Sequence, residues 1–242
     1  MATLIATERI KLLTTRSPWW STVLALGLTT GFAVIFALNS SSPADVEVWH
    51  TQLGYQFGLM VVMVMAALAV TTEYRFSTIR ATFLAVPNRT AALLAKTGVV
   101  AALALLIGLA AAFGSLAVGW TLIPDANLAL NSADAWRMVL GVPLVFTVAA
   151  VISVAVGIML RQSAGAIAVV LIWSMLVENL VSLIPQVGAE IRTWMPFAMT
   201  EQFLQGPLEG RPLGPWASFA YFAGVAVALL VAALVVAKKR DA

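Results

Sequence analysis

Six long apolar runs, separated by short polar segments, set the pattern of this 242-residue chain. A helix needs roughly 20 apolar residues to cross about 30 Å of hydrocarbon, because it rises 1.5 Å per residue. The runs cover residues 20–38, 53–72, 96–122, 136–160, 164–184 and 216–237. They predict an all-α, polytopic integral membrane protein with six transmembrane helices, organised as one transmembrane domain over residues 1–242.

Composition supports this class of protein and excludes a soluble domain. Hydrophobic residues make up 61% of the chain and charged residues 10%, with a mean hydropathy of +0.96. Soluble domains are about 45–50% apolar and about 25% charged. The polar segments are also too short for a separate catalytic domain. We therefore expect any energy source beyond an ion gradient to come from another polypeptide.

Metal and nucleic-acid chemistry are not expected. The chain has no cysteine, and its single histidine, His50, has no second histidine or paired carboxylates at ligand spacing. Lysines and arginines sit at the ends of the apolar runs rather than in one patch, which is typical of membrane proteins. We expect no metal site and no cofactor on this chain, and membrane lipid rather than nucleic acid as a partner.

The basic residues also predict the orientation of the spans. Of the 14 lysines and arginines, all but Arg137, Arg192 and Arg211 lie on the side that holds both termini. Lysine and arginine in short loops stay on the cytoplasmic side of a membrane. The expected location is a bacterial plasma (inner) membrane, crossed several times, with the N and C termini in the cytoplasm.

Residues 3–16 predict a helix at the membrane interface. Apolar side chains such as Ile10 and Leu13 fall on one arc, whereas Thr7, Glu8 and Lys11 fall on the other. We expect this amphipathic helix to lie along the inner membrane surface. The alternative is a frayed cytoplasmic tail.

Residues 74–86, between the second and third spans, predict a second short amphipathic helix. Phe76, Ile79, Phe83 and Val86 follow one another at steps of three, four and three, which places them on one narrow stripe. Pro87 disfavours helix at the residue before it. The stripe either floats on the lipid surface or docks into a cleft on a cytoplasmic partner.

Several of these features occur together in an order that is typical of one transporter family. A basic amphipathic start, residues 8–16, precedes the first span. The second span ends at an acidic residue, and an arginine-containing turn, a proline, an arginine and a lysine follow before the third span; here these are Glu73, Arg75, Arg80, Pro87, Arg89 and Lys96. The chain therefore resembles the permease (transmembrane) subunit of the type-2 ABC exporters, which share the ABCG-like transmembrane fold.

The resemblance implies a division of labour between chains. Residues 74–86 would be the coupling helix that touches a separate ATPase subunit, and residues 185–215 an outer segment that folds back toward the membrane. The coupling residues would be Glu73, Arg75, Phe76, Ile79, Arg80, Phe83 and Arg89. ATP and magnesium would bind two copies of that ATPase, because this chain has no phosphate-binding loop.

A complete exporter would also need a second permease subunit, identical or homologous to this chain. On this interpretation the chain is a transport subunit and not an enzyme. The expected substrate is hydrophobic or amphipathic, drug-like or lipid-like, and leaves the cell as in multidrug efflux.

One ionisable residue falls inside a predicted span. Glu178, next to Asn179, lies roughly two helical turns before Pro185 and therefore in the outer third of the fifth span. Carboxylates inside membranes usually face a protein interior or a wet cavity. Glu178 and Asn179 are therefore candidates for a substrate path or gate, and the alternative is an interfacial or inter-helix hydrogen bond.

Two other classes of function remain open from the sequence. An ion-coupled secondary transporter would place its ion and substrate sites near the middle of the membrane, often on broken helices. An integral membrane enzyme would need clustered histidine, aspartate or glutamate at the interface. The only charge inside a predicted span is shallow, and no such cluster is evident.

Overall fold

The computed structural model describes residues 2–40, 42, 46–86, 88–206 and 212–239, and these residues contain helices but no strand. Six helices are long and apolar enough to span a membrane. They are α2 (Arg16–Asn39), α4 (Tyr55–Arg75), α6 (Arg89–Leu122), α7 (Ala133–Leu160), the helix that begins with α8 (Ser163–Ile172) and α12 (Pro215–Lys239). The predicted all-α, six-span fold is confirmed.

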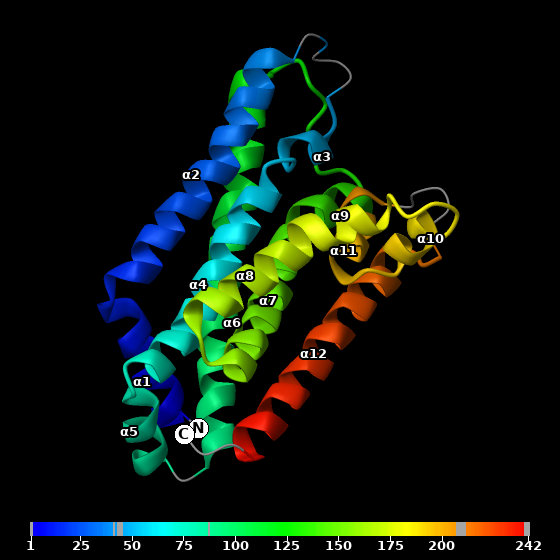
Figure 1. The fold of residues 1–242 in the computed structure, drawn as a ribbon. Coiled ribbons are helices and arrows are strands. Elements are labelled where there is room, and N and C mark those ends of the chain that lie inside the picture. The colour runs from blue at the N-terminus through cyan, green and yellow to red at the C-terminus, as the bar shows by residue number, and fades with distance from the viewer. Residues whose placement is uncertain (1, 41, 43–45, 87, 207–211, 240–242) are drawn as a thin grey trace.

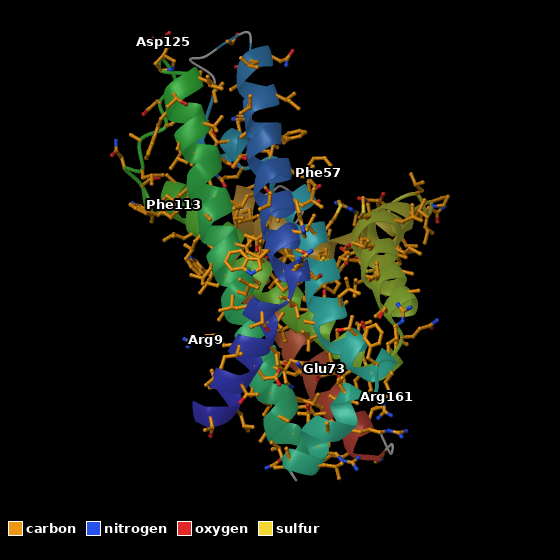
Figure 2. All side chains as sticks on the ribbon, turned by 90° about the vertical axis from the view of Figure 1, so that its left-hand side faces the viewer. Arg9, Phe57, Glu73, Phe113, Asp125 and Arg161 are labelled. Carbon is orange, nitrogen blue, oxygen red and sulfur yellow. The ribbon has the colours of Figure 1, made fainter. Side chains whose placement is uncertain are left out.

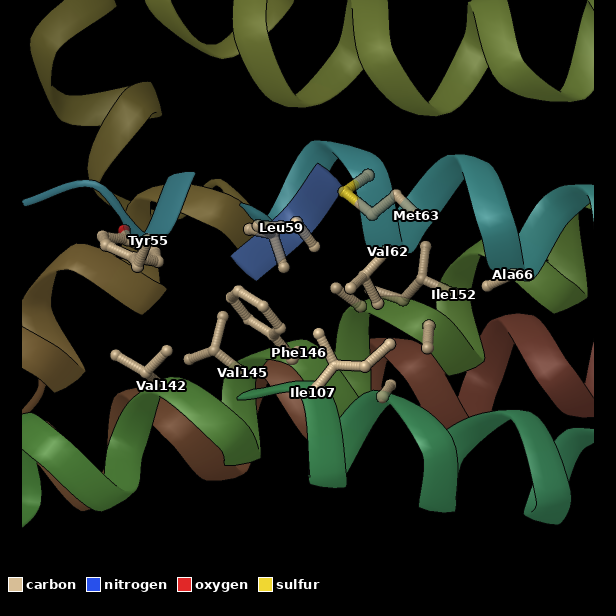
Figure 3. Close-up of a cluster of buried hydrophobic side chains, with 14 of the residues drawn as sticks. Tyr55, Leu59, Val62, Met63, Ala66, Ile107, Val142, Val145, Phe146 and Ile152 are labelled. Atoms are coloured by element: carbon tan, nitrogen blue, oxygen red, sulfur yellow. The ribbon is translucent and has the colours of Figure 1, made fainter. Parts of the chain in front are cut away.

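Helix α7 is the centre of the bundle (Figure 1). It packs against α4, α6, α8 and α12, and 67% of its most apolar stretch is buried, against 17% in α8 and in α12. In the core, Phe146 and Val145 of α7 meet Leu59 and Val62 of α4 (Figure 3). Because lipid is as apolar as these side chains, tight packing rather than escape from water holds the helices together.

Glycine permits the closest helix approaches. A Cβ atom on Gly58 of α4 would lie 2.2 Å from Thr29 Oγ1 of α2, and one on Gly108 of α6 would lie 2.5 Å from Pro143 Cα of α7. Such distances are far inside van der Waals contact, so any larger side chain would push the helices apart. Small residues therefore set the spacing of α2 and α4 and of α6 and α7.

The helices begin and end at places that hydropathy alone does not show. Helix α6 begins at Arg89, about two turns before the apolar run at 96–122, and the side chain of Asn88 accepts a hydrogen bond from Ala91 N at its start. The predicted helix over 74–86 is wrong in its bounds. Helix α4 continues to Arg75, Ser77 takes a left-handed conformation (φ 58°), and α5 covers only Thr78–Ala85.

The short helices gather at the two ends of the bundle. Helices α1 (Ala2–Thr14) and α5 lie at the same end as the last turn of α12 (Figure 1). At the other end, α3 (Val48–Thr51) lies beside the long helices. The segment after the fifth span forms α10 (Gly188–Thr193) and α11 (Pro196–Gln205), and α11 packs against α7 and α12.

Candidate functional site

Four charged side chains from three helices meet at the end of the bundle that holds α1 and α5. They are Glu8 and Lys11 of α1, Glu73 of α4 and Lys96 of α6. Lys11 Nζ lies 2.8 Å from Glu8 Oε1 and 3.4 Å from Glu73 Oε1. Lys96 Nζ lies 2.9 Å from Glu73 Oε1 and also pairs with Glu8 Oε2. Acid and base alternate, and we call this set the charge network.

The charge network is buried and electrically balanced. Glu8 and Lys96 are almost completely covered, which would be unfavourable for either charge without its partners. Burial alone raises the pKa of Glu8, but Lys96 and Lys11 outweigh it and hold that pKa below its usual value. Burial lowers the pKa of Lys11, but Glu8 and Glu73 outweigh it and raise that pKa. Both side chains therefore stay charged at neutral pH.

The charge network fixes the orientation of α1. Glu8 and Lys11 lie one turn apart on the same face of the helix, so both point at α4 and α6. The apolar residues Ile5, Ile10 and Leu13 are exposed on the other side. Two members of the predicted polar arc, Glu8 and Lys11, are thus packed against the protein, although Thr7 is exposed. On the apolar side, Ile10 and Leu13 are free to contact lipid, whereas Leu12 packs against the core.

Helix α5 is tied to the same network. Lys11 Nζ donates a hydrogen bond to Thr82 Oγ1 at 3.2 Å, which joins α5 to α1. Ile79 is only 3% exposed and faces the core, and Phe83 is partly buried with the Arg89 guanidinium 5.4 Å from its ring centre. The stripe of Phe76, Ile79, Phe83 and Val86 is therefore not a single outer surface.

The outer surface of this region runs along different residues. Phe76, which lies between the end of α4 and the left-handed Ser77, is 67% exposed. Within α5, Leu84 is 85% exposed and the exposed Arg80 lies one turn before it. The Arg75 guanidinium lies 5.5 Å from the centre of the Phe76 ring. We call Phe76, Arg80 and Leu84 the outer face of α5. Leu84 is the member that periodicity missed, because the apolar stripe pointed to the buried side.

Of the seven predicted coupling residues, Glu73 joins the charge network and Ile79 joins the core. Figure 2 shows Glu73 at the α5 end of the molecule, far from Asp125 at the opposite end. The sequence pattern placed Glu73 and Lys96 in one motif, but it did not reveal that Glu8 and Lys11 complete their pairing. The only sequence signal was the one-turn spacing of Glu8 and Lys11.

Glu178 lies near the opposite end of the bundle, where a π-helical turn, Trp173–Val177, precedes α9 (Glu178–Val181). It is 3% exposed and accepts hydrogen bonds from Phe197 N at 3.0 Å, Ala198 N at 2.8 Å and Trp173 Nε1 at 3.2 Å. Those two amides belong to the first turn of α11, whose donors have no partner within the helix. Glu178 therefore caps α11 from a distant helix.

A small cavity of about 150 Å³ adjoins this cap. Asn179 donates to Met175 O at 2.7 Å and accepts from Arg192 Nη2 at 3.3 Å, and Arg192 pairs with Glu201 at 3.1 Å. Among the two candidate roles for Glu178, these contacts correspond to the inter-helix hydrogen bond.

The described ranges hold no group of three or more histidine, aspartate or glutamate side chains that could bind a metal ion. His50 accepts a hydrogen bond from Glu47 N and stacks on Phe36 instead.

No family model matches the chain, and no curated protein matches it either. The fold defines an all-α, multi-pass membrane protein, and the charge network with the adjoining α5 is its strongest candidate site.

Proposed function

We propose that this chain is the permease subunit of an ATP-driven exporter, powered by a separate ATPase that docks at the α5 end of the bundle. The observation that carries the proposal is the link between an exposed short helix and three long ones. The outer face of α5 is available to a partner, while the inner side of α5 is held by Ile79 and Thr82.

The charge network gives such a partner a means of moving the spans. A push on α5 reaches α1 through the contact of Thr82 with Lys11, and reaches α4 and α6 through Glu73 and Lys96. Helix α1 continues into α2 after one extended residue, Thr15. A movement of α5 would thereby reach three spans, α2, α4 and α6.

The remaining parts of the proposal follow from the same assignment. The α5 end faces the cytoplasm of a bacterial cell, where the basic loops and both termini lie. Two ATPase subunits bind ATP and magnesium, and a second permease subunit, identical or homologous, completes the path. The substrate is a hydrophobic or amphipathic molecule, drug-like or lipid-like, moved outward.

Glu178 is hydrogen-bonded three times, which disfavours its use as the proton site of an ion-coupled carrier.

The test is co-purification with the ATPase whose gene lies beside the gene for this chain, if that ATPase carries a phosphate-binding loop. Phe76→Ala and Leu84→Ala should each weaken the association about tenfold, because fully burying a Phe or Leu side chain that is exposed in the free chain is worth about 1.5–3 kcal/mol. Leu183→Ala is the matched control, since Leu183 is 74% exposed at the other end. Equal binding by all three variants would place the ATPase elsewhere and refute the proposal.

A further inference from the structure

A groove of about 950 Å³ runs along α1, α4, α5 and α6 beside the charge network. Its wall on α4 is apolar and includes Met65, Leu68 and Ala69. Its other end is polar, where Glu73 and Lys11 reach the surface of the groove. Binding pockets for small molecules occupy about 300–1,000 Å³, so the groove has room for a ligand with an apolar chain and a polar head.

One atom of the charge network lacks a partner. Glu73 Oε1 accepts hydrogen bonds from both Lys11 and Lys96, but the buried Glu73 Oε2 has no hydrogen-bond partner among the described residues. A buried acceptor without a donor is unfavourable by about 1–3 kcal/mol, and more when it is charged. Glu73 also lines the groove, so a small turn of its carboxylate would bring this covered oxygen to a donor on the ligand.

The electrostatic balance of the charge network defines the kind of head group. Two carboxylates face two ammonium groups, so the site has no net charge that would attract an anion. Lys11 already donates to Glu8, Glu73 and Thr82, which are as many bonds as an ammonium can make. Within the described part of the chain, Lys96 donates only to Glu8 and Glu73, which leaves one N–H for a phosphate. The site therefore suits a zwitterionic head, which pairs a phosphate with N–H donors of its own.

The position of the groove indicates where such a ligand comes from. Ser17 and Pro18 line it, and the next two residues, Trp19 and Trp20, are exposed. Tryptophan gathers at the level of lipid head groups. The exposed apolar arc of α1 lies at the same end of the bundle (Figure 2). The groove thus adjoins the head-group layer of the membrane.

We propose that this groove binds a phospholipid with a primary ammonium head, of the phosphatidylethanolamine type. The Glu73 carboxylate turns toward the groove so that the ammonium donates to Oε2, and one acyl chain lies along Met65, Leu68 and Ala69. The bound lipid then contacts both α1 and α4 and supplies the donor that Glu73 Oε2 lacks within the charge network. This inference concerns the membrane-embedded chain and does not depend on the proposed ATPase partner.

The experiment uses a matched pair of lipids that differ only in three methyl groups on nitrogen. The full chain is stripped of lipid in detergent, incubated with equimolar phosphatidylethanolamine and phosphatidylcholine of identical acyl chains, and examined by native mass spectrometry. We expect about tenfold preference for the ethanolamine lipid, the effect of one hydrogen bond to a charged group, because choline has no N–H to donate.

Two variants locate the site. Ala69→Phe fills the apolar wall and should abolish the preferential binding, whereas Ala102→Phe, at an exposed position of α6 outside the groove, should keep it. Glu73→Gln should bring the two lipids to similar affinity, because its amide no longer offers a charged acceptor. Equal binding of both lipids to the wild-type chain, or undiminished preference in Ala69→Phe, would overturn the inference. Neither result bears on ATPase association, which is measured separately.

Discussion

Two buried glutamates, Glu8 and Glu178, are accommodated in opposite ways at opposite ends of this molecule. Glu8 is neutralised by two lysine side chains. Lys11 lies one turn later in the same helix, and Lys96 reaches Glu8 from α6. Glu178 is held by fixed donors, two backbone amides and an indole. Long side chains can follow helices as they shift, whereas backbone amides cannot. The comparison indicates an adaptable joint at the α5 end and a rigid one at the α11 end.

The largest effect should come from removing the central lysine of the adaptable joint. Lys96→Met leaves two buried carboxylates with one lysine between them and should lower the free energy of unfolding by about 3–5 kcal/mol. Thermal unfolding in detergent measures the loss. The double variant Glu8→Gln with Lys96→Met restores the charge balance and should recover part of it. If the single and double variants are equally unstable, the pairing of Glu8 with Lys96 is not what matters.

A smaller effect is expected at the rigid joint. In Glu178→Gln, one carboxylate oxygen becomes an NH₂ group, which cannot accept from the amide it faces. We expect a loss of about 1–3 kcal/mol, the range for a buried donor left without an acceptor. Glu190→Gln on α10 is the control, because it makes the same change at an exposed position. Thermal unfolding of Glu178→Gln at the wild-type temperature would contradict the capping role.

The response to pH should distinguish the charge network further. The pKa of Glu8 is lowered from 4.5, so its contribution is present above that value and is lost as pH falls through the lowered pKa. The pKa of Lys11 is raised from 10.5, so its contribution is present below that value and is lost as pH rises through the raised pKa.

When unfolding temperature is followed against pH, the contribution of the charge network should therefore be flat between about pH 5 and pH 10 and fall on both sides. Because Lys11 is partly exposed, its share should not exceed about 1 kcal/mol. In Lys11→Met the alkaline decline should become smaller, while Arg9→Met, on the same helix, should leave it unchanged. An identical alkaline decline in wild type and Lys11→Met would show that other groups cause it.

Single-cysteine variants of this cysteine-free chain should have the smallest effect on stability. Labelling them tests directly which end of the bundle faces the cytoplasm. Thr78→Cys on α5 should react with an impermeant maleimide only after permeabilisation, and Ala189→Cys on α10 should react from outside. Both positions are exposed, so neither variant should unfold. External labelling of Thr78→Cys would show that the α5 end faces outward, opposite to the proposed orientation.

The spans were predictable because hydropathy is a local property of the chain, whereas both joints depend on residues far apart in sequence. Nothing local shows that Glu8 meets Lys96 or that Glu178 reaches the amides of Phe197 and Ala198. The start of α6 at Arg89 was hidden for a related reason. Charged residues interrupt its apolar run, although they belong to the same helix. The exposed Leu84 was missed because an apolar stripe does not tell which side faces the core.

The π-helical turn at Trp173–Val177 has a consequence for how the chain tolerates changes in length. Such a turn contains one more residue than an α-helical turn would, and it directly precedes Glu178. Deleting Leu176 would restore ordinary helical geometry, and the residues on either side would keep nearly their present orientation, because the wider turn takes up its extra residue within one turn. The contact of Glu178 with α11 should therefore tolerate the loss of one residue from this turn, whereas it depends on the carboxylate of Glu178 itself.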